Sequence, residues 1–94
     1  MQDKSKVLRG IYMAASKNQI REWVDRGVKT GATHVIIVYD RWDYEDFPVY
    51  IDKGQSVEER VSSYDGKDMC SVMEVYNLSM DIDAQMNEYR AWHL

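Results

Sequence analysis

The chain has little of several features that would each place it in a known class of protein. It contains one cysteine, Cys70, so it can form neither a disulfide within the chain nor a zinc site built on cysteines. It has one proline and five glycines, and 45% of its residues are hydrophobic, so we expect no disordered or low-complexity region. Its 12 basic residues are scattered and outnumbered by 16 acidic ones, which disfavours nucleic acid as a main partner.

Long apolar runs are also missing. No stretch approaches the ~20 apolar residues that a membrane span needs, and residues 1–6 are too polar for a leader sequence. We therefore expect a cytoplasmic protein with no membrane partner. The 94 residues correspond to a single domain, residues 1–94, whose core is thin. Seven tyrosines and three tryptophans exceed what such a core can bury, which favours a ligand site or a subunit interface.

Capping signals and hydrophobic periodicity predict three helices. Ser16 followed by Gln19 is typical of a capping box, and a helix from there would end at a glycine, Gly31. A second capping box opens a helix at Ser56 that runs to about residue 64. The last helix is capped by Asp81 or Asp83 and runs toward residue 89. Before them, residues 1–15 form a short helix or an arm.

Three β-branched or alternating segments predict strands, at residues 33–40, 47–52 and 69–78. Pro48 places the second strand at the sheet edge, or delays its start, because proline cannot donate to a ladder. Simple alternation along the third strand puts two sets of side chains on opposite faces: Met69, Met73 and Val75 on one, and Cys70, Val72, Tyr76 and Leu78 on the other.

Together these segments predict an α+β fold, a three-stranded and mainly antiparallel sheet packed with helices in the order α-β-β-α-β-α. The first strand is apolar on both faces and so requires two covering layers. In so short a chain one of these layers could come from another subunit. We therefore expect a homo-oligomer.

The loop between the first two strands is dense in carboxylates. Magnesium and calcium prefer several oxygen ligands, so a metal site is one interpretation, although the spacing does not match an EF-hand. Solvation of charges at a hairpin tip is the other interpretation, and we expect no metal and no cofactor. A metal-dependent phosphoesterase remains an alternative function, using His34 with four loop residues: Asp40, Asp43, Glu45 and Asp46.

Aromatic rings and arginines lie next to each other at three places. A nucleobase stacks on an aromatic ring and an arginine binds its phosphate, so such pairs are candidates for ligand binding. The alternative is that the rings pack against the sheet while the arginines balance acidic neighbours. The expected ligand-binding residues are Tyr39, Arg41, Trp42, Asp43, Tyr44 and Tyr50 around the loop, Arg60 and Tyr64 on the second helix, and Arg90 and Trp92 near the end.

Catalytic motifs are missing from the sequence. It contains no nucleophile elbow, no HExxH and no glycine-rich phosphate loop, and its two histidines, His34 and His93, do not belong to a recognisable constellation. We therefore name no catalytic residue and favour a protein that is not an enzyme.

Three segments resemble a group of small, largely uncharacterised proteins of bacteria and their phages. That group shares a G-x-T-H strand, an acidic D-Y-E-D-Y/F-P hairpin and an N-E-x-R-A tail. Here the matching segments are residues 31–38, 43–50 and 85–91, with residues 72–76 also similar. The resemblance implies a phage or bacterial setting and no particular activity.

From these observations we expect a non-catalytic protein that binds a small molecule. A nucleotide is the preferred ligand, and in a phage the protein would act as a sponge that sequesters a nucleotide signal of host defence, by analogy of size and class alone. A protein–protein adaptor that uses the exposed aromatic residues is a further alternative.

Overall fold

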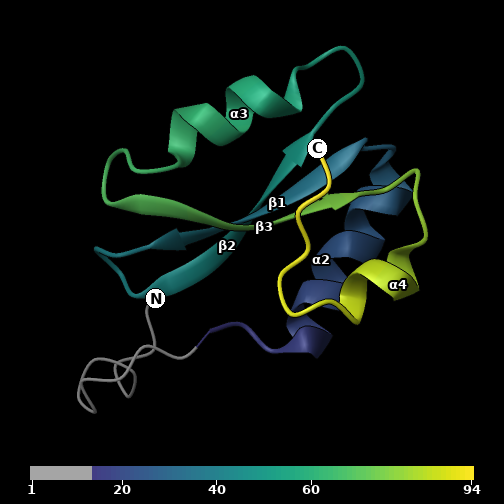
Figure 1. Cartoon of the computed structure of the whole chain (residues 1–94), viewed down its shortest axis with the longest axis horizontal. Helices are drawn as coiled ribbons and strands as arrows, with labels where there is room; N and C mark the ends of the chain where they lie inside the picture. Colours follow the sequence, from purple (N-terminus) through teal and green to yellow (C-terminus); the bar gives the residue numbers. More distant parts are fainter. Residues whose placement is uncertain (1–13) are drawn as a thin grey trace.

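The computed structural model describes residues 14–94 (Figure 1). The helix or arm expected over residues 1–15 therefore lies, apart from its last two residues, outside the described part of the chain. The predicted α+β fold and its order α-β-β-α-β-α are confirmed. The elements are α2 (Lys17–Thr30), β1 (His34–Asp40), β2 (Glu45–Ile51), α3 (Val57–Tyr64), β3 (Cys70–Asn77) and α4 (Ile82–Met86).

The helices begin at the capping residues that the sequence indicates. The hydroxyl of Ser16 accepts the backbone N–H of Gln19 at 3.1 Å, and Ser56 does the same at the start of α3. Gly31 ends α2 in the left-handed conformation with φ 80°. Asp81 caps α4 by accepting the N–H of Ala84 at 3.1 Å. This helix ends at Met86, well short of residue 89, because the chain then turns back toward the sheet.

The sheet has the strand order β2-β1-β3, and both pairings are antiparallel. Central strand β1 contributes alternate side chains to two hydrophobic clusters. Ile36 and Val38 pack with α3 on one face, and Val35 and Ile37 pack with α2 on the other. Figure 1 shows α3 on one side of the sheet and α2 with α4 on the opposite side. Helices of the same chain thus cover both faces of β1, so no second subunit is needed to cover the sheet.

A β-bulge in β3 corrects the predicted faces of that strand. The register passes from Ile37 opposite Glu74 to Val38 opposite Val72, so Met73 is the extra residue. Beyond the bulge every side chain changes face. Val75 therefore packs with Val72 and Cys70 under α3, whereas Tyr76 and Leu78 pack under α2. Simple alternation had grouped Val75 with the opposite set because it could not register the extra residue.

The two edges of the sheet differ. Strand β2 is an edge strand, which confirms the placement of Pro48. It begins at Glu45 and not at residue 47, so the hairpin loop is shorter than the predicted strand ranges imply. On the other side, the C-terminal segment forms a parallel bridge with β3. The N–H of Val75 donates to the carbonyl of Ala91 at 2.9 Å, and the N–H of His93 donates to the carbonyl of Val75 at 3.0 Å. This segment thus pairs with the outer edge of β3 at Val75.

Candidate functional site

The β1–β2 hairpin tip presents its large side chains to solvent. Trp42 is 74% exposed and Tyr44 is 44% exposed. The carboxylate of Asp40 accepts the N–H of Trp42 at 2.8 Å, and the N–H of Arg41 donates to the carbonyl of Met69 at 2.8 Å. The tip is thus tied to the turn that precedes β3. It projects from the end of the sheet.

Backbone strain is concentrated at the same end of the molecule. Among residues 14–94, the non-glycine residues with positive φ are Tyr44 (59°), Asp68 (51°) and Met69 (65°). Arg41 links the two turns further, because its guanidinium donates to the hydroxyl of Ser71 at 2.6 Å. Conformations of this kind persist only where surrounding contacts hold them.

The carboxylates of the hairpin do not converge on one point. Asp46 lies on the α2 side of the sheet, where it accepts the N–H of Ala15 at 2.7 Å, whereas Asp40 lies on the α3 side opposite Cys70. His34 is at the other end of β1, about 20 Å from Asp40 along an extended strand. Within the described part of the chain, no three acidic, histidine or cysteine residues are grouped to hold a metal ion. The geometry does not assemble the phosphoesterase constellation.

His34 contacts its neighbour in the chain and is partly buried. Its Nδ1 lies 3.0 Å from the hydroxyl of Thr33, and burial lowers the pKa of its imidazole. His93 instead contacts the Glu88 carboxylate through Nε2, at 2.7 Å to the nearer oxygen.

Several expected ligand-binding residues have packing roles. The hydroxyl of Tyr50 donates to the carbonyl of Trp23 at 3.0 Å and so fastens β2 to α2. Tyr64 packs edge-to-face on Phe47 with ring centroids 6.1 Å apart, and the guanidinium of Arg60 lies 6.0 Å from the Tyr64 ring. Half-buried Tyr39 lies opposite Asp46 and Ser71, Asp43 is in the loop, and Trp92 is in the tail bridge. The structure does not bring the ten ligand-binding residues expected from the sequence together in one site.

A concave site lies on the α2 side of the sheet, between β1, the start of α2 and the tail. We call it the tail hollow, and its volume is about 190 Å³. Its base is apolar and its sides carry two carboxylates, one guanidinium and one phenol. The lining residues are Ala14, Ala15, Ile20, Ile37, Asp46, Met73, Glu74, Tyr89 and Arg90.

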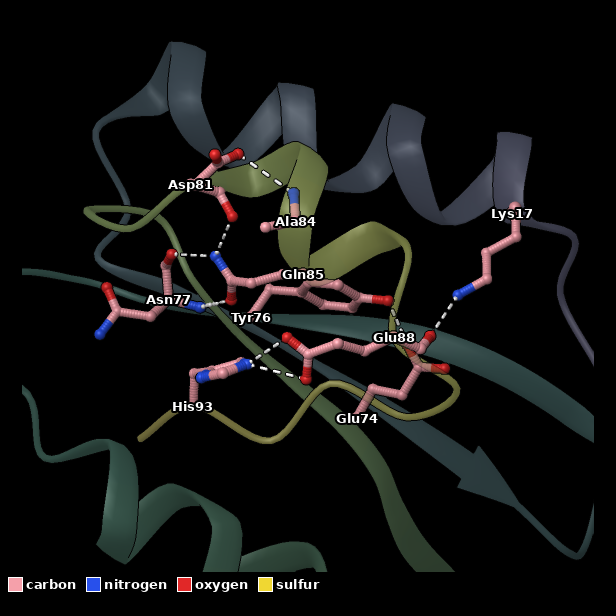
Figure 2. Close-up of polar contacts among 9 residues, drawn as sticks. All are labelled: Lys17, Glu74, Tyr76, Asn77, Asp81, Ala84, Gln85, Glu88 and His93. Carbon is pink, nitrogen blue, oxygen red and sulfur yellow. Dashed lines mark hydrogen bonds and ion pairs between the residues drawn. The ribbon is translucent and has the colours of Figure 1, made fainter.

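Glu74 is a charged group of the tail hollow that a buried side chain anchors. The hydroxyl of Tyr76, two positions along β3, donates to its carboxylate. Tyr76 is fully buried, and burial followed by this hydrogen bond raises the pKa of its phenol above the usual value of 10. The phenol therefore stays protonated and holds Glu74 in place. Figure 2 shows both side chains.

A network of polar contacts fixes the tail that forms one side of the tail hollow (Figure 2). The fully buried side chain of Gln85 accepts the N–H of Asn77 at 2.8 Å and donates to its carbonyl at 2.8 Å. The ammonium of Lys17 donates to the carbonyl of Glu88 at 3.2 Å, and the Glu88 side chain binds His93. These contacts dock residues 87–90 beside the start of α2. Tyr89 and Arg90 are exposed to solvent and line the hollow.

Among the residues that line this hollow, the sequence predicted a ligand-binding role only for Arg90, and not for Glu74, Tyr89 or Met73. The hollow receives residues from segments that are far apart in the sequence, and no local pattern groups them. Asp46 comes from the acidic hairpin, Met73 and Glu74 from the third strand, and Tyr89 and Arg90 from the tail.

The fold and this site define a small α+β protein with a hollow closed on one side by its C-terminal tail. Comparisons with protein-family models, with curated proteins and with solved structures give no match. No helix of the described residues is long and apolar enough to cross a membrane.

Proposed function

We propose that this chain is a non-catalytic protein that binds a small polar molecule in the tail hollow. The observation that carries the proposal is convergence. Asp46, Glu74 and Arg90 are far apart in the sequence, belong to different elements and line one concave site. Ligand sites typically combine an apolar base with a few polar groups that orient the ligand, and Ile20, Ile37 and Met73 supply such a base.

The size of the tail hollow restricts the ligand. The volume of the hollow is about 190 Å³. Pockets that enclose drug-sized molecules typically measure about 300–1,000 Å³. A cyclic dinucleotide, with its tens of non-hydrogen atoms, could place only one group there. The proposed ligand is therefore smaller than the nucleotide signal expected from the ring and arginine pairs of the sequence, and sequestration of a small signal stays part of the proposal.

The test is a nuclear magnetic resonance titration of the isotope-labelled chain with pooled small metabolites. We expect amide shifts at Ile37, Glu74 and Arg90, because these residues line the site. The bulky substitution Met73→Trp should fill the hollow and abolish the shifts. Trp92→Phe, outside the hollow, is the matched control and should leave them unchanged. Recovery of unmodified ligand from the denatured complex would support binding without turnover.

Two results would contradict this function. One is the absence of any shift with every pool. The other is shifts that persist in a folded Met73→Trp variant. Shifts confined to residues 41–44 and 65–69 would instead transfer the function to the hairpin tip.

A second candidate function, a protein–protein adaptor, is favoured by the hairpin tip. Trp42 and Tyr44 are exposed, belong to residue types that dominate binding energy in interfaces, and are held in a tied and strained turn. Four carboxylates in and beside the loop indicate a partner whose apolar pocket is bordered by lysine and arginine.

This candidate predicts that a single protein captured from the native cell lysate is lost with Trp42→Ala. Trp92→Ala is the control, because Trp92 is also exposed, at 47%, but lies in the tail. The captured protein must then bind the purified chain in a calorimeter, more weakly at high salt. Capture that survives Trp42→Ala would remove the tip from this role.

A further inference from the structure

The charged side chains that line the tail hollow indicate which kind of small polar molecule it would bind. Glu74 and Arg90 both line the hollow, yet none of the ion pairs among residues 14–94 includes either of them. Glu74 accepts a hydrogen bond from the neutral Tyr76 phenol, and Arg90 lies over the Tyr89 ring, with its guanidinium carbon 6.0 Å from the ring centroid. One negative and one positive group thus line a single site without neutralising each other.

The positions of these groups suit a ligand that carries both charges. Glu74 projects from β3, held by the buried Tyr76, whereas Arg90 approaches from the docked tail. Asp46, on β2 opposite Tyr39, adds a second carboxylate on the other side of β1 from Glu74, because β1 lies between β2 and β3. An ammonium group would be stabilised by the carboxylates, and a carboxylate would be stabilised by the guanidinium, which can donate two parallel hydrogen bonds.

We propose that the tail hollow binds a small zwitterion, an α-amino acid or a molecule with the same two charged groups, with its ammonium on Glu74 and its carboxylate on Arg90. This inference rests on the proposed function and specifies its ligand class. The side chain of the ligand would lie against Ile20, Ile37 and Met73. Tyr76 is a positioning residue, since it holds Glu74 and does not itself line the hollow.

The experiment is calorimetry and thermal denaturation of the full chain with each of the common L-amino acids, in dilute cacodylate, which is not itself a zwitterion. Inorganic phosphate, AMP, cyclic di-AMP and spermidine represent the other ligand classes. We expect one or a few amino acids to bind and raise the melting temperature. The N-acetyl and the amide derivatives of the best ligand should each bind at least about tenfold more weakly, because each lacks one charge.

Protein variants locate the two contacts. Glu74→Gln and Arg90→Gln should each weaken binding by about tenfold or more. Tyr76→Phe should also weaken it, and Glu74→Gln should remove that effect, because the phenol acts through Glu74. The matched control is Arg26→Gln on the outer face of α2, which should bind as the wild type does. Arg90 is exposed, so its substitution does not threaten folding and tests the proposal even if Glu74→Gln unfolds.

Several outcomes overturn the inference, and they separate it from the proposed function. Failure of every amino acid to bind, or equal binding of the singly charged derivatives, rejects the zwitterion. If AMP or phosphate binds instead, and Arg90→Gln prevents it, the ligand class is wrong while the tail hollow remains the binding site. Amino-acid binding that neither Glu74→Gln nor Arg90→Gln weakens rejects the hollow itself.

Discussion

At the scale of single residues, Gly27 governs how closely α2 approaches the sheet. It is buried in the last turn of the helix, and a Cβ at this position would lie 2.9 Å from Cγ2 of Val35 and 3.0 Å from Cδ1 of Leu78. Val35 is fully buried and β-branched, so its methyl group has little freedom to move. The glycine is required here for close packing and not for a turn.

Gly27→Ala should therefore destabilise the protein although alanine favours helix. Overpacking typically costs about 1–3 kcal/mol and the gain in helix propensity is about 1 kcal/mol, so we expect a net loss of about 1 kcal/mol in the free energy of unfolding. Urea denaturation measures it. Val28→Ala, at the half-exposed next position, is the control and should change stability by less than about 0.5 kcal/mol. A Gly27→Ala variant more stable than the wild type would contradict the packing argument.

Tyr76 makes stability depend on pH in the alkaline range. Burial raises the pKa of its phenol in the folded state above the ordinary value of 10, so the folded protein retains a proton that the unfolded chain releases. The contribution is complete below pH 10 and is lost as pH rises above it, by up to about 1.4 kcal/mol per pH unit. The difference in free energy of unfolding between wild type and Tyr76→Phe should thus shrink between pH 10 and 11. A difference that stays constant over this range would show that the phenol ionises normally in the folded state.

At the scale of elements, the bulge in β3 decides which residues meet. Deleting Met73 should leave a regular ladder in which Val72 remains opposite Val38 and Glu74 opposite Ile37. Every side chain would keep its face. Deleting Val75 instead should close the ladder by moving Glu74 opposite Ile36, inside the buried cluster under α3.

We therefore predict that the chain without Met73 folds and that the chain without Val75 does not, because an unpaired carboxylate would enter an apolar core. Circular dichroism and thermal denaturation of the two deletion variants measure the difference. Equal stability of the two variants would mean that the bulge residue does not decide which face of the sheet the side chains of β3 occupy.

At the scale of the whole molecule, two hydrophobic clusters on opposite faces share one strand. Ile36 belongs to the cluster under α3 and Ile37 to the one under α2, and both are no more than 1% exposed. Because β1 supplies both clusters, neither layer can unfold while the other keeps a complete sheet. We expect cooperative unfolding of the two layers.

Ile36→Val and Ile37→Val should each lower the free energy of unfolding by about 0.5–1.5 kcal/mol. Trp42 and Trp92 are replaced by phenylalanine in both variants, so that the fluorescence comes from Trp23, which packs on the α2 cluster. This fluorescence should change together with far-ultraviolet circular dichroism. Separate transitions in either variant would show that the layers unfold independently.

The homo-oligomer stays a prediction at this scale, and it now needs a different interface. Both faces of the sheet are covered within the chain, so a partner copy would bind elsewhere on the surface of the molecule, such as the hairpin tip or the edge of β2. Light scattering at micromolar concentration measures the mass directly.

The local elements could be read from the sequence because their signals are local. Ser16, Ser56 and Asp81 are followed within a few residues by the N–H groups that they cap, and Gly31 adopts a conformation that other residues avoid. Strand β1 could be predicted because a continuous apolar and β-branched run is typical of a strand that is buried on both faces. The aromatic hairpin tip, too, could be predicted from the residue types between the two strands.

The tertiary structure alone decided the rest. The bulge at Met73 arises from pairing with β1, which no periodicity within β3 can reveal. The tail hollow requires Asp46, Glu74 and Arg90 to meet, and their meeting depends on that bulge, on the strand order β2-β1-β3 and on a tail docked along β3. Periodicity and capping act over a few residues, whereas a binding site is an arrangement of residues that only the folded chain brings together.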